Sequence, residues 1–129
     1  MSKVILSEVK KLLGIMDDYT EFDRDIVLNI NMALNTLTQN GIGPERGFEI
    51  TVDGNETLED FIAGTEGGTE IPIMHNSVIN YLYLRTKIIF DPPQSGSVME
   101  VYKAQIEELL WRLNIQVDSI KTFTTKYGE

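Results

Sequence analysis

Histidine and cysteine, two residue types that often carry catalysis, are scarce in this chain. His75 is the only histidine and cysteine is absent, so a Ser-His-Asp arrangement has to use His75. It stands beside Met74 near the expected start of a helix, without the neighbouring carboxylate that would orient a catalytic base. The lack of cysteine also excludes a thiolate nucleophile, a disulfide framework and a cysteine-based zinc site. We therefore interpret His75 as a plain surface or boundary histidine.

A cluster of carboxylates near the N-terminus has the oxygen ligands that a hard cation prefers. Its members are Asp17, Asp18, Glu21, Asp23 and Asp25. Their spacing fits no EF-hand loop, and the segment that starts at Asp53 has Leu58 where such a loop requires glycine. A metal-dependent hydrolase built on this cluster is the reading we favour least. Acidic residues also stabilise the first turn of a helix through its dipole, and we adopt that interpretation.

Two glycine-rich stretches lack the other residues of a nucleotide-binding loop. The stretch from Gly64 to Gly68 is not followed by the Lys-Ser/Thr pair of a phosphate-binding loop, and Gly41 with Gly43 lacks the third glycine of a dinucleotide fingerprint. Both are predicted to be turns. We thus expect no catalytic residue, no cofactor and no metal, and a protein that is not an enzyme.

Length and charge limit the class of protein further. A chain of 129 residues is one domain by length, and 42% hydrophobic residues are enough for a modest core. The formal net charge of −9 argues against a protein that grips nucleic acid through its phosphates. No apolar run approaches the roughly 18 residues of a membrane span, and the first residues are too charged for a secretory signal. We expect the protein to stay inside the cell that makes it.

Apolar periodicity and helix-end signals predict a mainly α fold, a small helical bundle. Helices are expected over residues 4–13, 23–39, 71–90 and 98–113. Residues 45–70 carry eight carboxylates against one arginine and are predicted to form a mobile acidic flap, with a short strand over 48–52 and one or two helical turns capped by Thr57. The helical domain is expected to span residues 1–114, followed by an extended or disordered, flexible C-terminal tail over 115–129.

The best-marked feature is a long helical hairpin whose corner is Asp91, Pro92 and Pro93. Proline lacks the N–H that continues a helix and biases the preceding residue away from the α region. Ser97 and Glu100 have the spacing of a capping box that would start the second helix. The core face predicted for that helix consists of Val98, Met99, Val101, Tyr102, Ile106, Leu109, Leu110 and Leu113. In the first helix Arg85 projects from the apolar arc, so it must reach solvent or pair with a carboxylate.

Apolar residues also lie on sides of these helices that face away from the predicted core. They form three strips, which are Leu28 with Met32, Ile79 with Tyr83 and Phe90, and Ala104 with Trp111. Isolated exposed apolar residues are normal, and such strips can face one another within a subunit, so an internal role stays open. For Trp111, together with Arg112, we favour an interface, because tryptophan is enriched at interface hot spots.

Four stretches of the chain, taken in order, match a known pattern. They are LSEVKKLLGI from Leu6, FDRDIV from Phe22, NGIGPERGF from Asn40, and FDPPQS from Phe90 continuing to ELLWRLN, which ends at Asn114. In this order and spacing they resemble the head-tail connector, or neck adaptor, proteins of tailed bacteriophages and prophages. The resemblance covers most of the chain.

The resemblance implies a small helical subunit that assembles into a closed homo-oligomeric ring beneath the portal. The ring would continue the channel through which the genome is packaged and ejected, and DNA would pass through it without specific binding. Further implied partners are the portal protein and a head-completion or tail-side neck protein, with no membrane. The protein would be a structural part of the virion neck, present in the host bacterial cytoplasm during assembly. Residue by residue, the match assigns only the hairpin corner and Trp111, Arg112 and Leu113 at the end of the last helix.

An alternative of a different class also stays open. A small regulatory or inhibitory protein could bind one partner through the surface around Trp111. Two physical arguments favour the ring: a ring needs two different faces on each subunit, which helices apolar on two sides provide, and excess negative charge keeps a channel wall from holding DNA by its phosphates.

Overall fold

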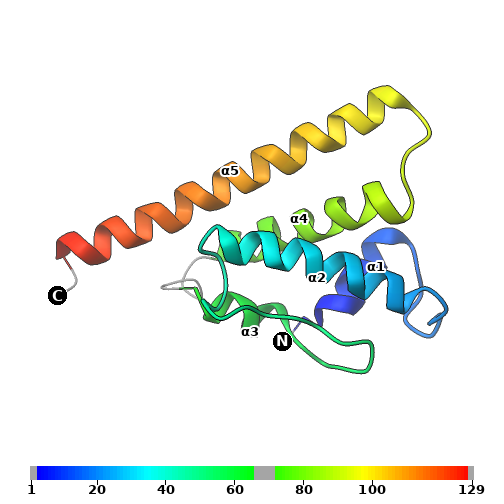
Figure 1. Ribbon diagram of the computed structural model, residues 1–129, viewed down its shortest axis with the longest axis horizontal. Helices are drawn as coiled ribbons and strands as arrows, with labels where there is room; N and C mark the ends of the chain where they lie inside the picture. The colour runs from blue at the N-terminus through cyan, green and yellow to red at the C-terminus, as the bar shows by residue number, and fades with distance from the viewer. Residues whose placement is uncertain (1–2, 66–71, 128–129) are drawn as a thin grey trace.

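The computed structural model describes residues 3–65 and 72–127, with the backbone alone for residues 72–73 and 119–127. The helices of this part are α1 (Ile5–Leu13), α2 (Asp23–Gln39), α3 (Leu58–Ala63), α4 (Pro72–Phe90) and α5 (Gly96–Tyr127). Helix α4 is central, because α1, α2 and α3 all pack against it and α5 runs along it from another side (Figure 1). The predicted mainly α helical bundle is confirmed.

Local sequence signals set several of the helix ends. Helix α1 ends at Gly14 in the left-handed region, with a φ of 82°. There the Gly14 N–H donates to the Lys11 carbonyl at 3.1 Å and the Ile15 N–H to the Lys10 carbonyl at 2.8 Å, the two bonds of a Schellman motif. At the start of α3, the Thr57 hydroxyl accepts a hydrogen bond from the Asp60 N–H at 3.1 Å. The cap predicted at Thr57 is therefore confirmed.

The hairpin corner lies where the two prolines predict it. Helix α4 stops at Phe90, and Lys87 Nζ donates to Asp91 Oδ2 at 2.8 Å just before Pro92 and Pro93. Helix α5 begins earlier than the Ser97 capping box predicts. Ser95 is the residue whose hydroxyl accepts from a first-turn amide, the Val98 N–H at 3.3 Å, so Ser95 and not Ser97 caps the helix.

The predicted acidic flap is wrong as a description of residues 45–65. No strand forms over 48–52 or elsewhere in the described residues, where the one ladder contact is a bridge between Val4 and Thr57. The segment is anchored in the core, because Ile50, Phe61 and Ile62 are buried there. Residues 66–69 of the expected glycine-rich connection lie outside the described residues.

A side chain of α2 explains why Ile50 does not pair in a sheet. Asn31 Nδ2 donates to the Ile50 carbonyl at 3.0 Å, and the Ile50 N–H donates to Asn31 Oδ1 at 2.8 Å. One amide side chain therefore satisfies both backbone groups of Ile50, and the backbone needs no strand partner there.

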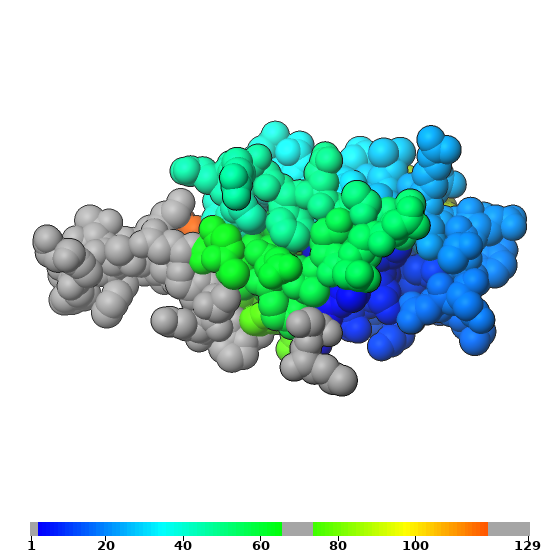
Figure 2. Space-filling model, turned by 90° about the horizontal axis from the view of Figure 1, so that it is seen from below, coloured from blue at the N-terminus to red at the C-terminus, as the bar shows by residue number. Residues whose placement is uncertain are grey.

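The N-terminal segment and the segment around α3 share one face of the molecule. The Ile5 N–H donates to the Glu56 carbonyl at 3.0 Å, and the Leu58 N–H donates to the Lys3 carbonyl at 2.8 Å. Figure 2 shows this face, in which the blue N-terminal helix lies directly beside the green segment of α3. These bonds join residues more than fifty positions apart and hold α3 against the bundle.

The expected extended conformation of the C-terminal tail is also wrong. Helix α5 does not end at Leu113 but continues to Tyr127, and its last turns extend beyond the rest of the bundle (Figure 1). The physical reason is that Val117 is 2% exposed and lies one helical turn after the fully buried Leu113, so the core face of α5 runs past Asn114. Whether residues 115–129 form a unit separate from residues 1–114 stays a prediction.

Arg85 has hydroxyl groups, and not a carboxylate, as its hydrogen-bond partners. Its Nη1 donates to the Tyr81 hydroxyl at 2.7 Å and to the Thr36 hydroxyl at 3.3 Å, and its guanidinium carbon lies 5.6 Å from the centre of the Tyr81 ring. The side chain is half-buried between α4 and α2. Hydroxyl acceptors and an aromatic ring thus take the place of the expected acidic partner.

Candidate functional site

The acidic cluster near the N-terminus does not assemble into a metal site. Among the described residues, no three histidine, aspartate or glutamate side chains converge as metal ligands would. Asp17 instead accepts a hydrogen bond from the Ser7 hydroxyl at 2.8 Å, and Asp23 pairs with Lys10. His75 is half-buried near the start of α4. The contacts of Asp17 and Asp23 therefore join α1 to the segment that leads into α2 and to the start of α2.

Lys10 is a buried cation that the sequence analysis missed. Its side chain is 2% exposed, and Nζ donates to the backbone carbonyls of Asp17 at 3.1 Å and Tyr19 at 2.8 Å. Nζ also lies 2.8 Å from Asp23 Oδ1, although that oxygen has no well-aligned hydrogen bond, so the contact is an ion pair. The connection between α1 and α2 is thus folded around one ammonium group. The available signal was the place of Lys10 at the edge of the apolar arc of its helix.

Identifiable contacts shift the pKa values of two titratable groups, Glu59 and Lys87. Partial burial of Glu59 opposes its ionisation, but hydrogen bonds from the backbone N–H of Lys3, at 3.0 Å, and of Glu59 itself outweigh it, aided by the charge of His75. The pKa of Glu59 is therefore lowered. The hydrogen bond with Asp91 raises the pKa of Lys87. Glu59 joins the first turn of α3 to the N-terminal segment, and Lys87 joins the last turn of α4 to Asp91.

The outer face of α5 carries an exposed apolar strip. Trp111 is 63% exposed, Val101 is 53% exposed, and Ile115 and Ala104 are exposed on the same side. These four residues, which we name the α5 outer strip, lie opposite the face that packs on α4 and are separated by three, seven and four positions, with Glu107 and Glu108 in the longest interval. The prediction that Val101 belongs to the core face is wrong. Ile115 was missed, because the helix was expected to end before it.

The strip predicted on α4, Ile79 with Tyr83 and Phe90, is buried or half-buried in the subunit. Ile79 is only 8% exposed and belongs to the hydrophobic core, since α4 is covered on several sides. Phe90 packs partly against the core, with its ring centre 5.3 Å from that of Phe22 in an edge-to-face arrangement. Tyr83 is half-buried. Of these three predicted interface residues, only Tyr83 lines a cleft.

The strip predicted on α2 does lie at the surface. Leu28 is 64% exposed and Met32 is also exposed one turn later, while the opposite face of α2 is buried against α4. Further exposed apolar residues surround the connection between α1 and α2, and none of them was predicted to lie at an interface. They are Leu12, Met16, Tyr19 and Phe22.

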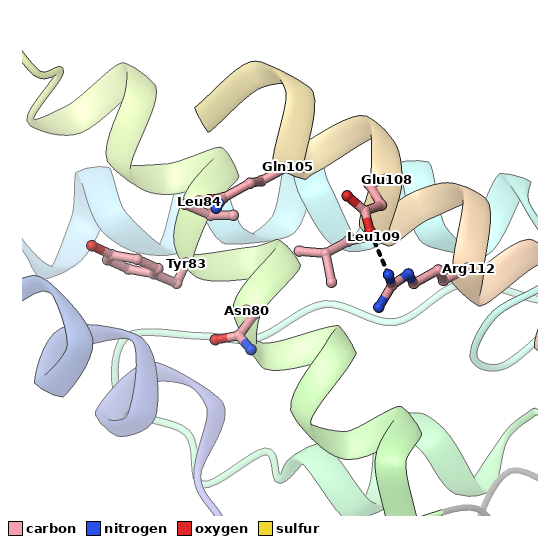
Figure 3. Close-up of a pocket in the computed structure, with 7 residues that line it drawn as sticks. All are labelled: Asn80, Tyr83, Leu84, Gln105, Glu108, Leu109 and Arg112. Carbon is pink, nitrogen blue, oxygen red and sulfur yellow. Dashed lines mark ion pairs between the residues drawn. The ribbon is translucent and has the colours of Figure 1, made fainter. Parts of the chain in front are cut away.

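A cleft of about 340 Å³ opens between α4 and α5. Its lining residues are Asn80, Tyr83 and Leu84 from α4 and Gln105, Glu108, Leu109 and Arg112 from α5 (Figure 3). Arg112 pairs with Glu108 on the α5 wall. The floor is apolar, because Leu84 is buried and Leu109 is half-buried, and the rim carries amide and charged groups. Arg112, predicted beside Trp111 at an interface, thus lies in the cleft.

None of the helices in the described ranges combines the length and apolar character of a membrane span. The model of a family described as phage connector protein matches residues 5–119, which is most of the chain. Comparison with curated proteins and with solved structures found no match.

Proposed function

The chain belongs to the phage connector protein family, and from that premise we propose that it forms a closed homo-oligomeric ring that docks on the portal. The ring would continue the DNA channel of the virion neck for genome packaging and ejection. Its other contact would be a head-completion or tail-side neck protein. The role is structural, and we propose no enzymatic activity.

The α5 outer strip is the observation that carries this proposal. A helix of a monomeric protein normally exposes a polar face, whereas α5 exposes Val101, Trp111 and Ile115 opposite its packed face. Large apolar side chains gathered on one exposed side of a helix are a feature of interaction sites. An assembled neighbour would remove this surface from water.

A second exposed surface supports a ring over a simple pair. Leu28 and Met32 lie on α2, which packs on α4 from a different side than α5 does. A ring uses two different patches on each subunit, since each copy contacts one neighbour through the first patch and the other neighbour through the second. The subunit therefore carries exposed apolar surface on more than one side.

The net charge fits a channel wall. Twenty acidic residues against eleven basic ones give each subunit a net charge of −9, and copies in a ring would multiply that charge. Such a wall repels phosphates, so DNA would slide past it without specific binding.

Native mass spectrometry and electron microscopy of the purified chain test the proposal, alone and mixed with the portal protein. We expect one closed ring stoichiometry, formed either by concentration or by contact with the portal. A chain that stays monomeric or dimeric at high concentration and forms no ring with the portal would contradict the proposal. That outcome would favour the alternative of a regulatory protein with a single partner.

A further inference from the structure

Resting on the proposed ring, we propose that Trp111 of one subunit inserts into the cleft between α4 and α5 of the next subunit. The cleft and the tryptophan would then be the two halves of one heterologous contact. A second copy of this chain is the occupant that the following observations favour.

The cleft has the size and lining that an indole ring needs. Its volume of about 340 Å³ accommodates one bicyclic side chain. Leu84 and Leu109 supply apolar contact, and Tyr83 adds an aromatic edge. Indole has a single polar group, an N–H that only donates, and the rim carries the side-chain amides of Asn80 and Gln105, whose oxygens can accept it.

Trp111 cannot occupy the cleft of its own subunit. It lies on the outer side of α5, roughly 110° around the helix axis from the middle of the positions that line the cleft. The side chain is 63% exposed, so its own chain leaves the indole largely uncovered. An exposed anchor and an open cleft on two sides of one helix are complementary between copies and not within one copy.

The net charge of the subunit favours a contact made by apolar groups. Subunits with a net charge of −9 repel one another, so a contact between them needs a cation or an apolar surface. Trp111 and the apolar floor of the cleft provide such surfaces, and within the cleft the guanidinium of Arg112 is already paired with the carboxylate of Glu108. A guanidinium also stacks favourably on an indole face.

The first experiment uses the fluorescence of the intact chain, which contains a single tryptophan. We expect the emission to shift to shorter wavelength and quenching by acrylamide to fall severalfold as rings form, because the indole leaves water. Rings that form with unchanged emission and quenching would overturn the insertion and leave the proposed ring intact. No ring under any condition would contradict both.

The second experiment fills the cleft. The Asn80→Phe variant places a phenyl group at the exposed rim of the cleft. The Asn55→Phe variant makes the same replacement on the exposed loop before α3. Circular dichroism and a denaturation midpoint confirm that both variants fold. We expect Asn80→Phe to weaken assembly about 30-fold or more, the size of an interface hot spot, and to leave Trp111 quenchable, while Asn55→Phe assembles normally. Equal assembly of the two variants would overturn the proposal.

Discussion

Lys10 Nζ and Asp23 Oδ1 form a buried ion pair, 2.8 Å long, between the end of α1 and the start of α2. The same ammonium binds the carbonyls of Asp17 and Tyr19, so one side chain organises the whole connection. That connection presents Met16, Tyr19 and Phe22 to solvent. The pair therefore links the stability of the bundle to the shape of one exposed apolar surface.

Replacing Lys10 with methionine should destabilise the subunit by about 3 kcal/mol. Removal of one partner leaves Asp23 buried without its counter-charge and leaves two carbonyls without a donor. Urea denaturation followed by circular dichroism measures the loss. Lys11→Met is the matched control, because Lys11 is the exposed neighbour in the same helix. Similar midpoints for the two variants would show that the pair contributes little.

Asn31→Ala should lower the free energy of unfolding by about 1–3 kcal/mol, because both backbone groups of Ile50 lose their hydrogen-bond partners. The amide of Ile50 should also exchange with deuterium much faster than in the native chain. Asn29→Ala provides the comparison, because the Asn29 side chain bonds only the exposed Asp25 carbonyl within the same helix. Unchanged protection of the Ile50 amide would mean that the segment is held by its apolar contacts alone.

Truncation measures how far the core extends along α5. A chain ending at Asn114 loses Val117, which is 2% exposed, whereas a chain ending at Asp118 keeps it. Burying a valine is worth about 1.5–3 kcal/mol, so the shorter chain should unfold at a lower urea concentration by that free energy. Both chains lack the last turns of α5, so the difference between their free energies of unfolding reports on the turn that contains Val117. Equal stability of the two chains would mean that Val117 contributes nothing to the core and would contradict the prediction.

Trp111→Ala should leave the stability of the isolated subunit within about 0.5 kcal/mol, because most of the side chain is already in water. Its effect should fall on assembly, measured by native mass spectrometry over a concentration series. Leu12→Ala removes an exposed apolar side chain from α1 and is the control. A large loss of subunit stability would place Trp111 in the core instead.

Acid should weaken the contact between Glu59 and the N-terminal segment. Hydrogen bonds hold the pKa of Glu59 below its ordinary value of 4.5. A lowered pKa in the folded state adds stability that is present above the unfolded pKa and is lost as the pH falls through the folded pKa. The native chain should therefore lose more stability than Glu59→Gln between about pH 5 and pH 3. Urea midpoints across that range test this, with the exposed Glu49→Gln as control, and parallel curves for the native chain and Glu59→Gln would contradict it.

The helices could be predicted because their signals are local. Gly14 ends α1, Thr57 caps α3, and Pro92 with Pro93 separates α4 from α5, and each acts on backbone groups within one turn of itself. The buried face of α2 followed from its period for the same reason. Membership of the connector family was likewise visible in the order of short motifs.

The candidate surfaces were only partly predictable. The exposure of Leu28, Met32 and Trp111 followed from the helix wheel, but a wheel does not show how many sides of a helix are covered. Ile79 is buried because α4 has neighbours on several sides, and Val101 is exposed because it lies on the outer side of α5, away from α4.

The helix boundaries at Gly14, at Thr57 and at Pro92 with Pro93 could be predicted from the sequence, as could the family. The partners of Lys10 and Asn31, the burial of Val117 and the cleft beside Arg112 became visible in the folded structure alone. Each of these depends on side chains that are far apart along the chain or on different helices. Such contacts form when apolar faces pack together, and the period of one helix does not specify which neighbour it meets.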